Sequence, residues 1–173
     1  IASKSTNADD GVLRTFRLAV ATTGEYSQFQ LMYNGVSTNA TDDKKKEVVL
    51  SAINATMTRV NAIFERDVSL TMELVANNSS VIFLDPETDG LTNDDGSVLI
   101  NQSQTVIDAN IGFGNYDIGH TFSTGGGGLA TLNSPCTLSK AKGVTGSSFP
   151  IGDTYDIDFV AHEIGHQFGA NHS

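Results

Sequence analysis

The sequence predicts an α/β fold, in which a twisted, mostly parallel sheet with an antiparallel edge strand packs against helices. Residues 15–21 and 68–74 alternate in hydrophobicity as strands do, and residues 44–66 carry hydrophobic side chains at helical spacing. Strands that alternate with helices along a chain indicate a parallel sheet. With 173 residues, of which 39% are hydrophobic, the chain has enough material for one sizeable core.

The first strand and the long helix carry the strongest patterns. Residues 15–21 read Thr-Phe-Arg-Leu-Ala-Val-Ala, which alternates well enough for a strand. A helix is expected from about Lys44 to Arg66, with Asp42 and Asp43 as candidate N-caps. Its hydrophobic residues fall on one face, which indicates a helix packed on the core: Val49, Ile53, Met57, Val60 and Phe64.

The elements that follow are shorter. A second strand is expected where Val68, Leu70, Met72 and Leu74 alternate with polar residues, and a short strand at 81–84. Residues 97–109 predict a second helix and residues 116–123 a strand. A short edge strand over 129–133 then precedes a loop that leads to the last helix.

The end of the chain has the spacing HExxHxxGxxH. His162 and His166 stand one turn apart on the same face of a helix, so both imidazoles can reach one metal ion. A continuing helix would carry His172 away from that metal. Gly169 is the expected helix end, because glycine adopts the left-handed conformation without a Cβ penalty and lets the chain turn back. His172 then becomes the third ligand.

Three imidazole ligands indicate a catalytic zinc site, in which one position stays open to water. Glu163 follows the first ligand but points in another direction, so we expect it to act as the general base. The opposite face of the helix carries a hydrophobic stripe that packs it on the core: Ile157, Val160, Ala161, Ile164 and Phe168.

This motif resembles the zinc signature of the metzincin clan of metalloendopeptidases. Gly127-Gly128-Leu129-Ala130, followed by Cys136 and Gly143-Val144 ahead of residues 158–163, is similar to the reprolysin (adamalysin-like) branch. Residues 17–26 look like bacterial secreted members of that family. The resemblance implies a metzincin-like N-terminal subdomain and a secreted, extracellular zinc metalloendopeptidase that acts on proteins or peptides.

The glycine-rich segment has two interpretations. Gly125 to Gly128 fits a flexible loop. An edge strand beside a metal site, however, has free backbone groups that bind an extended peptide as an added strand. The resemblance implies this second use, so Gly127, Gly128, Leu129 and Ala130 are the expected substrate-binding residues.

The sequence departs from the metzincin pattern after the third histidine. Metzincins carry a methionine turn there, whereas Met32, Met57 and Met72 all precede the motif. We therefore expect residues 1–173 to cover the catalytic domain through the zinc motif, to lack the C-terminal subdomain, and to cleave peptides poorly alone.

Composition and cysteine content narrow the possible functions and partners of the chain. A net charge of −10 argues against nucleic-acid binding, and no hydrophobic run approaches the roughly 20 residues of a membrane span. We expect a monomer. Cys136 is the only cysteine, so it is either a buried free thiol or, as the reprolysin resemblance implies, the partner of a cysteine beyond this chain.

The acidic segment from Asp85 to Asp95 resembles the opening of a calcium loop. Its twelfth position is Gly96 where such a loop has a glutamate, so the residues favour a solvated acidic turn over a calcium site. His120 lacks a motif partner and is assigned to structure or surface. The alternative functions are a catalytically silent peptide-binding module and a calcium-dependent adhesion domain.

Overall fold

The computed structural model describes residues 11–172, which contain a five-stranded sheet in the order β2-β1-β3-β5-β4. Its strands are β1 (Arg14–Thr22), β2 (Leu70–Leu74), β3 (Ile118–Ser123), β4 (Gly127–Ala130) and β5 (Gly143–Gly146). Neighbouring strands run parallel except for β4, which is antiparallel to β5 at the end of the sheet. The predicted mostly parallel sheet with an antiparallel edge strand is confirmed.

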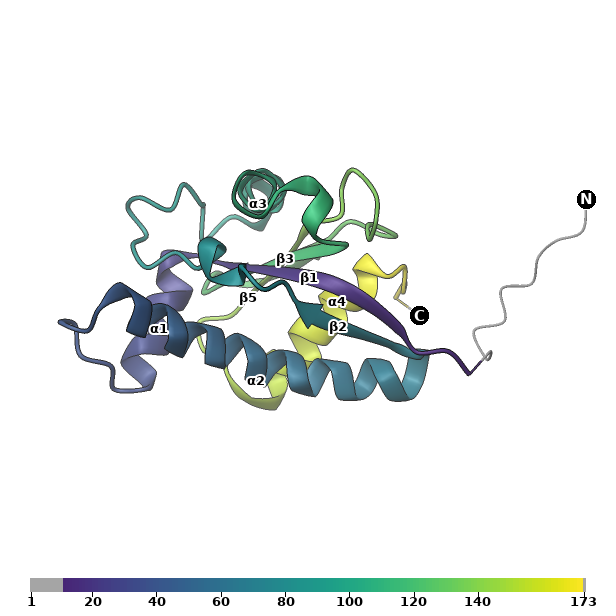
Figure 1. Ribbon diagram of the computed structural model, residues 1–173, viewed down its shortest axis with the longest axis horizontal. Helices are drawn as coiled ribbons and strands as arrows, with labels where there is room; N and C mark the ends of the chain where they lie inside the picture. The colour runs from purple at the N-terminus through teal and green to yellow at the C-terminus, as the bar shows by residue number, and fades with distance from the viewer. Residues whose placement is uncertain (1–10, 173) are drawn as a thin grey trace, which may run out of the picture.

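Helices cover both faces of this sheet (Figure 1). Helix α3 (Gly96–Ile111) lies on one face, and α1 (Gly24–Tyr33), α2 (Asp42–Val68) and α4 (His162–Gln167) lie on the other. Strand β1 shows why both faces are hydrophobic. Leu18 and Val20 pack toward α2, while Ala19 and Ala21 pack toward α3. The sheet is thus a buried central layer.

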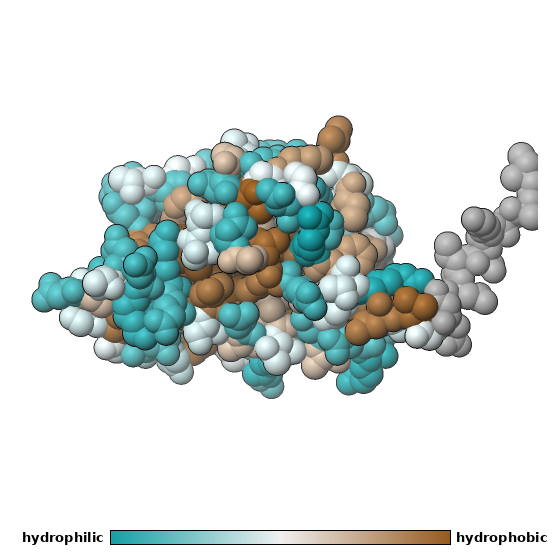
Figure 2. Space-filling view, viewed as in Figure 1, coloured by the Kyte–Doolittle hydropathy of each residue, from teal (hydrophilic) through white to brown (hydrophobic). Residues whose placement is uncertain are grey.

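The long helix confirms the predicted stripe, since Val49, Ile53, Met57, Val60 and Phe64 are all buried. Its N-cap differs from the prediction. The side chain of Thr41 accepts the backbone N–H of Lys44, and Asp42 and Asp43 occupy the first turn. There their negative charges interact favourably with the positive N-terminal end of the helix dipole. Figure 2 shows mainly hydrophilic side chains along the outer side of α2 and a hydrophobic area above its middle.

The structure corrects the start of the predicted second strand, the short strand at 81–84 and the edge strand. Val68 ends α2, and β2 begins only after Ser69, which adopts a left-handed conformation with φ of 54°. The strand expected at 81–84 is instead a 3₁₀ helix, η1 (Asn78–Val81), followed by a single bridge between Thr22 and Ile82. The edge strand covers Gly127–Ala130 rather than 129–133, because Asn133 has a positive φ of 53° and the chain turns there.

Two elements were not expected from the sequence. Helix α1 buries Tyr26, Ser27 and Gln30, so its inner face is partly polar and lacks a hydrophobic stripe. Strand β5 has only four residues, all buried, in the region expected to be a loop. β5 matters for the site, because it joins β3 to the edge strand β4.

Candidate metal centre

The helix that carries the first two histidines is anchored to the core through one face. A π-helical segment, η3 (Thr154–Ala161), runs directly into α4. Val160 and Ile164 are fully buried in the core cluster on the α2 side, and Ala161 and Phe168 pack against that cluster. Ile157 is only partly buried, because the π-helical winding rotates it away from the expected stripe. The other face of α4 carries His162 and His166.

The Nε2 atoms of the three motif histidines converge on one point. The distances are 3.0 Å from His162 to His166, 3.1 Å from His162 to His172, and 3.0 Å from His166 to His172. Zinc bound to imidazole at about 2.0–2.1 Å in tetrahedral geometry separates its ligands by about 3.3 Å. The three nitrogens are therefore spaced closely enough to share one tetrahedral ion. Within residues 11–172 they form the cluster of three potential metal ligands.

Gly169 ends the helix as predicted. Its φ is 100°, its N–H donates to the carbonyl of His166, and the N–H of Ala170 donates to the carbonyl of Gly165. This pair of hydrogen bonds is a Schellman motif, which a left-handed glycine makes easy. The turn reverses the chain and brings His172 back to the face that holds His162.

A hydrogen bond sets the tautomer of His166. Its Nδ1 lies 2.6 Å from the carbonyl oxygen of Ala170, which can only accept, so Nδ1 carries the proton. The lone pair is then on Nε2, the atom that faces the other two histidines. Such an outer hydrogen bond is typical of histidines that bind metal, because it fixes the ring and its tautomer.

Glu163 lies between the histidines and the edge strand. Its side chain is buried, and this burial raises the pKa of the carboxyl, although the nearby His166 and His172 lower it in part. The carboxyl group rests against Gly128 of β4. A Cβ at position 128 would lie 2.5 Å from the Cδ of Glu163 and closer still to Cγ and Oε1. A larger residue at position 128 would therefore force the Glu163 side chain or the strand to shift.

The edge strand exposes one side to solvent. In the described part of the chain β4 ends the sheet, and its only strand partner is β5. Gly127, Gly128 and Leu129 are exposed and Ala130 is partly buried.

The glycine run before the edge strand is not a loose loop. The side-chain oxygen of Asn93 accepts from the backbone N–H of Thr124 and from the hydroxyl of Thr23. Gly125 packs so closely on the backbone of Asn93 that a Cβ there would collide with it. The start of the edge strand is therefore held in place.

The remaining sequence candidates lie elsewhere. Cys136 is exposed and has a positive φ of 61°, so the interpretation as a buried thiol is wrong. His120 is fully buried, so of the two expected settings, structure or surface, it is not at the surface. In the acidic segment, Asp89 accepts the N–H groups of Gly24 and Leu91, and Asp85 accepts the N–H of Glu87. These carboxylates stabilise a turn, and calcium binding there is unsupported.

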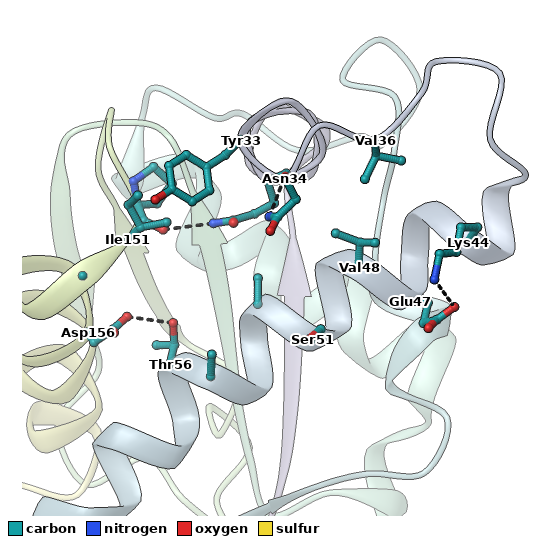
Figure 3. Close-up of a pocket in the computed structure, with 15 residues that line it drawn as sticks. Tyr33, Asn34, Val36, Lys44, Glu47, Val48, Ser51, Thr56, Ile151 and Asp156 are labelled. Carbon is teal, nitrogen blue, oxygen red and sulfur yellow. Dashed lines mark hydrogen bonds and ion pairs between the residues drawn. The ribbon is translucent and has the colours of Figure 1, made fainter.

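A separate groove lies between α1, α2 and residues 150–156 (Figure 3). Asp156 and Thr56 are hydrogen bonded at one end, at 2.8 Å, and Lys44 and Glu47 form an ion pair at the other. The three histidines do not line it. The carboxylate of Asp156 accepts from the hydroxyl of Thr56 and forms an ion pair with Arg59.

Comparison with known proteins agrees with this geometry. Residues 50–173 match the family described as Metallo-peptidase family M12B Reprolysin-like. No curated protein matches the chain. A solved structure described as "Structure of a chaperone-substrate complex" has a similar fold, with a TM-score of 0.59 and 13% sequence identity over 92% of this chain. The chain spans only 24% of that larger protein.

Proposed function

Because the chain belongs to the Metallo-peptidase family M12B Reprolysin-like, we propose that it is a zinc metalloendopeptidase with His162, His166 and His172 as ligands and Glu163 as general base. The observation that carries this proposal is the convergence of three Nε2 atoms within 3.1 Å of one another, beside a buried carboxylate. The family acts on peptide bonds, so the substrates are proteins or peptides.

Zinc held by the three imidazoles would act as a Lewis acid and would make a bound water a better nucleophile. Glu163 is the residue proposed to accept a proton from the attacking water and to return it to the leaving amine. Burial raises the pKa of the Glu163 carboxyl, so it takes up a proton more readily than an exposed carboxyl does. The Ala170 carbonyl fixes the ring of His166, with Nε2 toward the other two histidines.

The exposed edge of β4 supplies the substrate-binding surface in this proposal. An extended peptide pairs with the backbone of Gly127, Gly128, Leu129 and Ala130, as an added strand next to Glu163. Recognition through backbone groups tolerates many side chains. Leu129, with 43% of its surface exposed, offers a hydrophobic contact for the bound segment.

The wider setting is proposed from the same family membership. Residues 1–173 form the catalytic domain through the zinc motif, in an extracellular protein that works as a monomer. Within residues 11–172, no helix has the length and hydrophobicity that crossing a bilayer requires.

The test uses the full-length protein and combines metal analysis with digestion of a peptide library. We expect about one zinc per chain, and cleavage that stops with a chelator and returns when zinc is added. Glu163→Gln should retain zinc and lose cleavage, which serves as the control for contaminating proteases. Full zinc content without any cleavage would refute the peptidase and favour a silent peptide-binding module.

A further inference from the structure

The residue after the second ligand is tied to the sheet behind it. Gln167 is fully buried, and its Nε2 donates to the carbonyl of Gly119 at 2.9 Å and to the hydroxyl of Ser134 at 3.2 Å. A carbonyl oxygen can only accept, so the group facing it is the amide nitrogen. The amide oxygen of Gln167 then faces Nδ1 of His120, at 2.7 Å.

These contacts determine the protonation state of His120. Nδ1 must donate to the oxygen of Gln167, so Nε2 accepts from the hydroxyl of Thr145, 2.8 Å away. Burial of the ring lowers the pKa of His120 to about 4, and the imidazole is neutral at physiological pH. Every polar atom of the ring has a partner, and none of them faces the metal site.

The link continues to the edge strand. Thr145 on β5 is the register partner of Gly128 on β4, and Gly128 is the residue against which Glu163 rests. The contacts form a closed path from α4 through Gln167, His120 and Thr145 to β4, and back to α4 at Glu163. Gly143 leaves room for this path, because a Cβ there would lie 2.6 Å from Nδ1 of His120 and still closer to Gln167.

We propose that His120, Gln167 and Thr145 are positioning residues, which fix the distance between the Glu163 carboxylate and the peptide-binding edge of β4. This inference rests on the proposed peptidase function. All three side chains are fully buried, and the hydrogen bonds described above join them to one another, to Gly119 and to Ser134. They act by holding α4 and β4 at a fixed position relative to each other, through hydrogen bonds that are buried and directional.

The kinetic test uses a substitution that removes one hydroxyl. Thr145→Val breaks the bond to Nε2 of His120 with little change in shape, whereas Thr145→Ser retains the hydroxyl. Misplacement of catalytic groups by about 1 Å can cost about 10²-fold, so a partial loosening should lower kcat about tenfold. We expect KM to stay within about twofold, zinc content to be unchanged, and Thr145→Ser to restore most of the activity.

Thr121→Val provides the matched control. Thr121 is equally buried on β3 and donates to Ser103 on α3, away from the zinc helix. It should lower the melting temperature about as much as Thr145→Val does, without a selective loss of kcat. The positioning role would be overturned if the two substitutions lowered kcat equally. It would also be overturned if the loss of kcat in Thr145→Val were explained by its lower melting temperature alone.

A second readout needs neither metal nor activity. In nuclear magnetic resonance spectra of the metal-free protein, His120 should carry its proton on Nδ1, and Thr145→Val should shift the amide signals of both Gly128 and Glu163. Thr121→Val should shift neither. An Nε2-protonated ring, or unchanged signals at Glu163, would overturn the inference. If the full-length wild-type protein is inactive but gives the expected spectra, the result counts against the peptidase function and leaves the structural coupling standing.

Discussion

Gly128 gives a sharp test of how Glu163 meets the edge strand. We expect Gly128→Ala to impair catalysis without removing the metal. The added Cβ would lie 2.5 Å from Cδ of Glu163, whereas ordinary contacts begin at 3.4 Å. Either the carboxylate or the strand must therefore move by about 1 Å, a displacement that can cost about 10²-fold in rate.

The assay is the cleavage of a fluorogenic peptide, with zinc content measured on the same samples. Gly126→Ala is the control, because a Cβ at Gly126 has no atom within 4 Å and the residue lies in the same glycine run. We expect kcat/KM to fall about 10²-fold for Gly128→Ala and to change only a few-fold for Gly126→Ala. Zinc content should stay equal in both.

Two results would refute the reasoning. Equal losses in the two variants would show that the glycine run contributes through backbone freedom alone. A loss of zinc in proportion to activity in Gly128→Ala would show that the strand supports the ligands and not the carboxylate.

Three further predictions follow from the same geometry. Glu163→Gln should lower kcat by about 10²- to 10⁴-fold at unchanged zinc content, whereas His166→Ala should lose zinc and activity together; elemental analysis beside the peptide assay separates the two. Gly169→Ala should weaken zinc binding about tenfold, because an alanine at φ of 100° costs about 1–2 kcal/mol and its Cβ would collide with Asn133. Competition with a chelator measures the affinity, and an unchanged value would contradict the role of this turn. Because the pKa of His120 is lowered in the folded state, the unfolded chain binds more protons than the folded one between about pH 6.5 and about pH 4. The free energy of unfolding should therefore fall by about 3 kcal/mol as the pH drops through that window. Denaturant titrations of the metal-free protein should show this loss, and His120→Asn should lack that part of the pH dependence.

Local patterns determined much of the fold and of the candidate site. The positions of His162, Glu163 and His166 depend on the spacing within a single helical turn, and the reversal at Gly169 depends on one residue that tolerates a positive φ. The stripe of α2 and the alternation of β1 likewise depend on neighbours a few residues apart. Such features can be predicted because their cause lies within a short segment.

Only the tertiary structure decided which distant residues meet. The buried face of α1 includes Ser27 and Gln30, and β5 has just four residues, so neither has the hydrophobic period that marks an element in sequence. The π-helical winding before α4 also has no period that the sequence could reveal.

The contacts that support the site are the clearest case. Gln167 and His120 are 47 residues apart, and His120 and Thr145 are 25 apart. No local pattern distinguishes them from other polar residues. Sequence determined the turn that brings the three histidines together, because its geometry is that of one helix and one glycine. The structure decided how that turn is held against the edge strand, because the hydrogen bonds responsible form only when β3, β5 and α4 pack together.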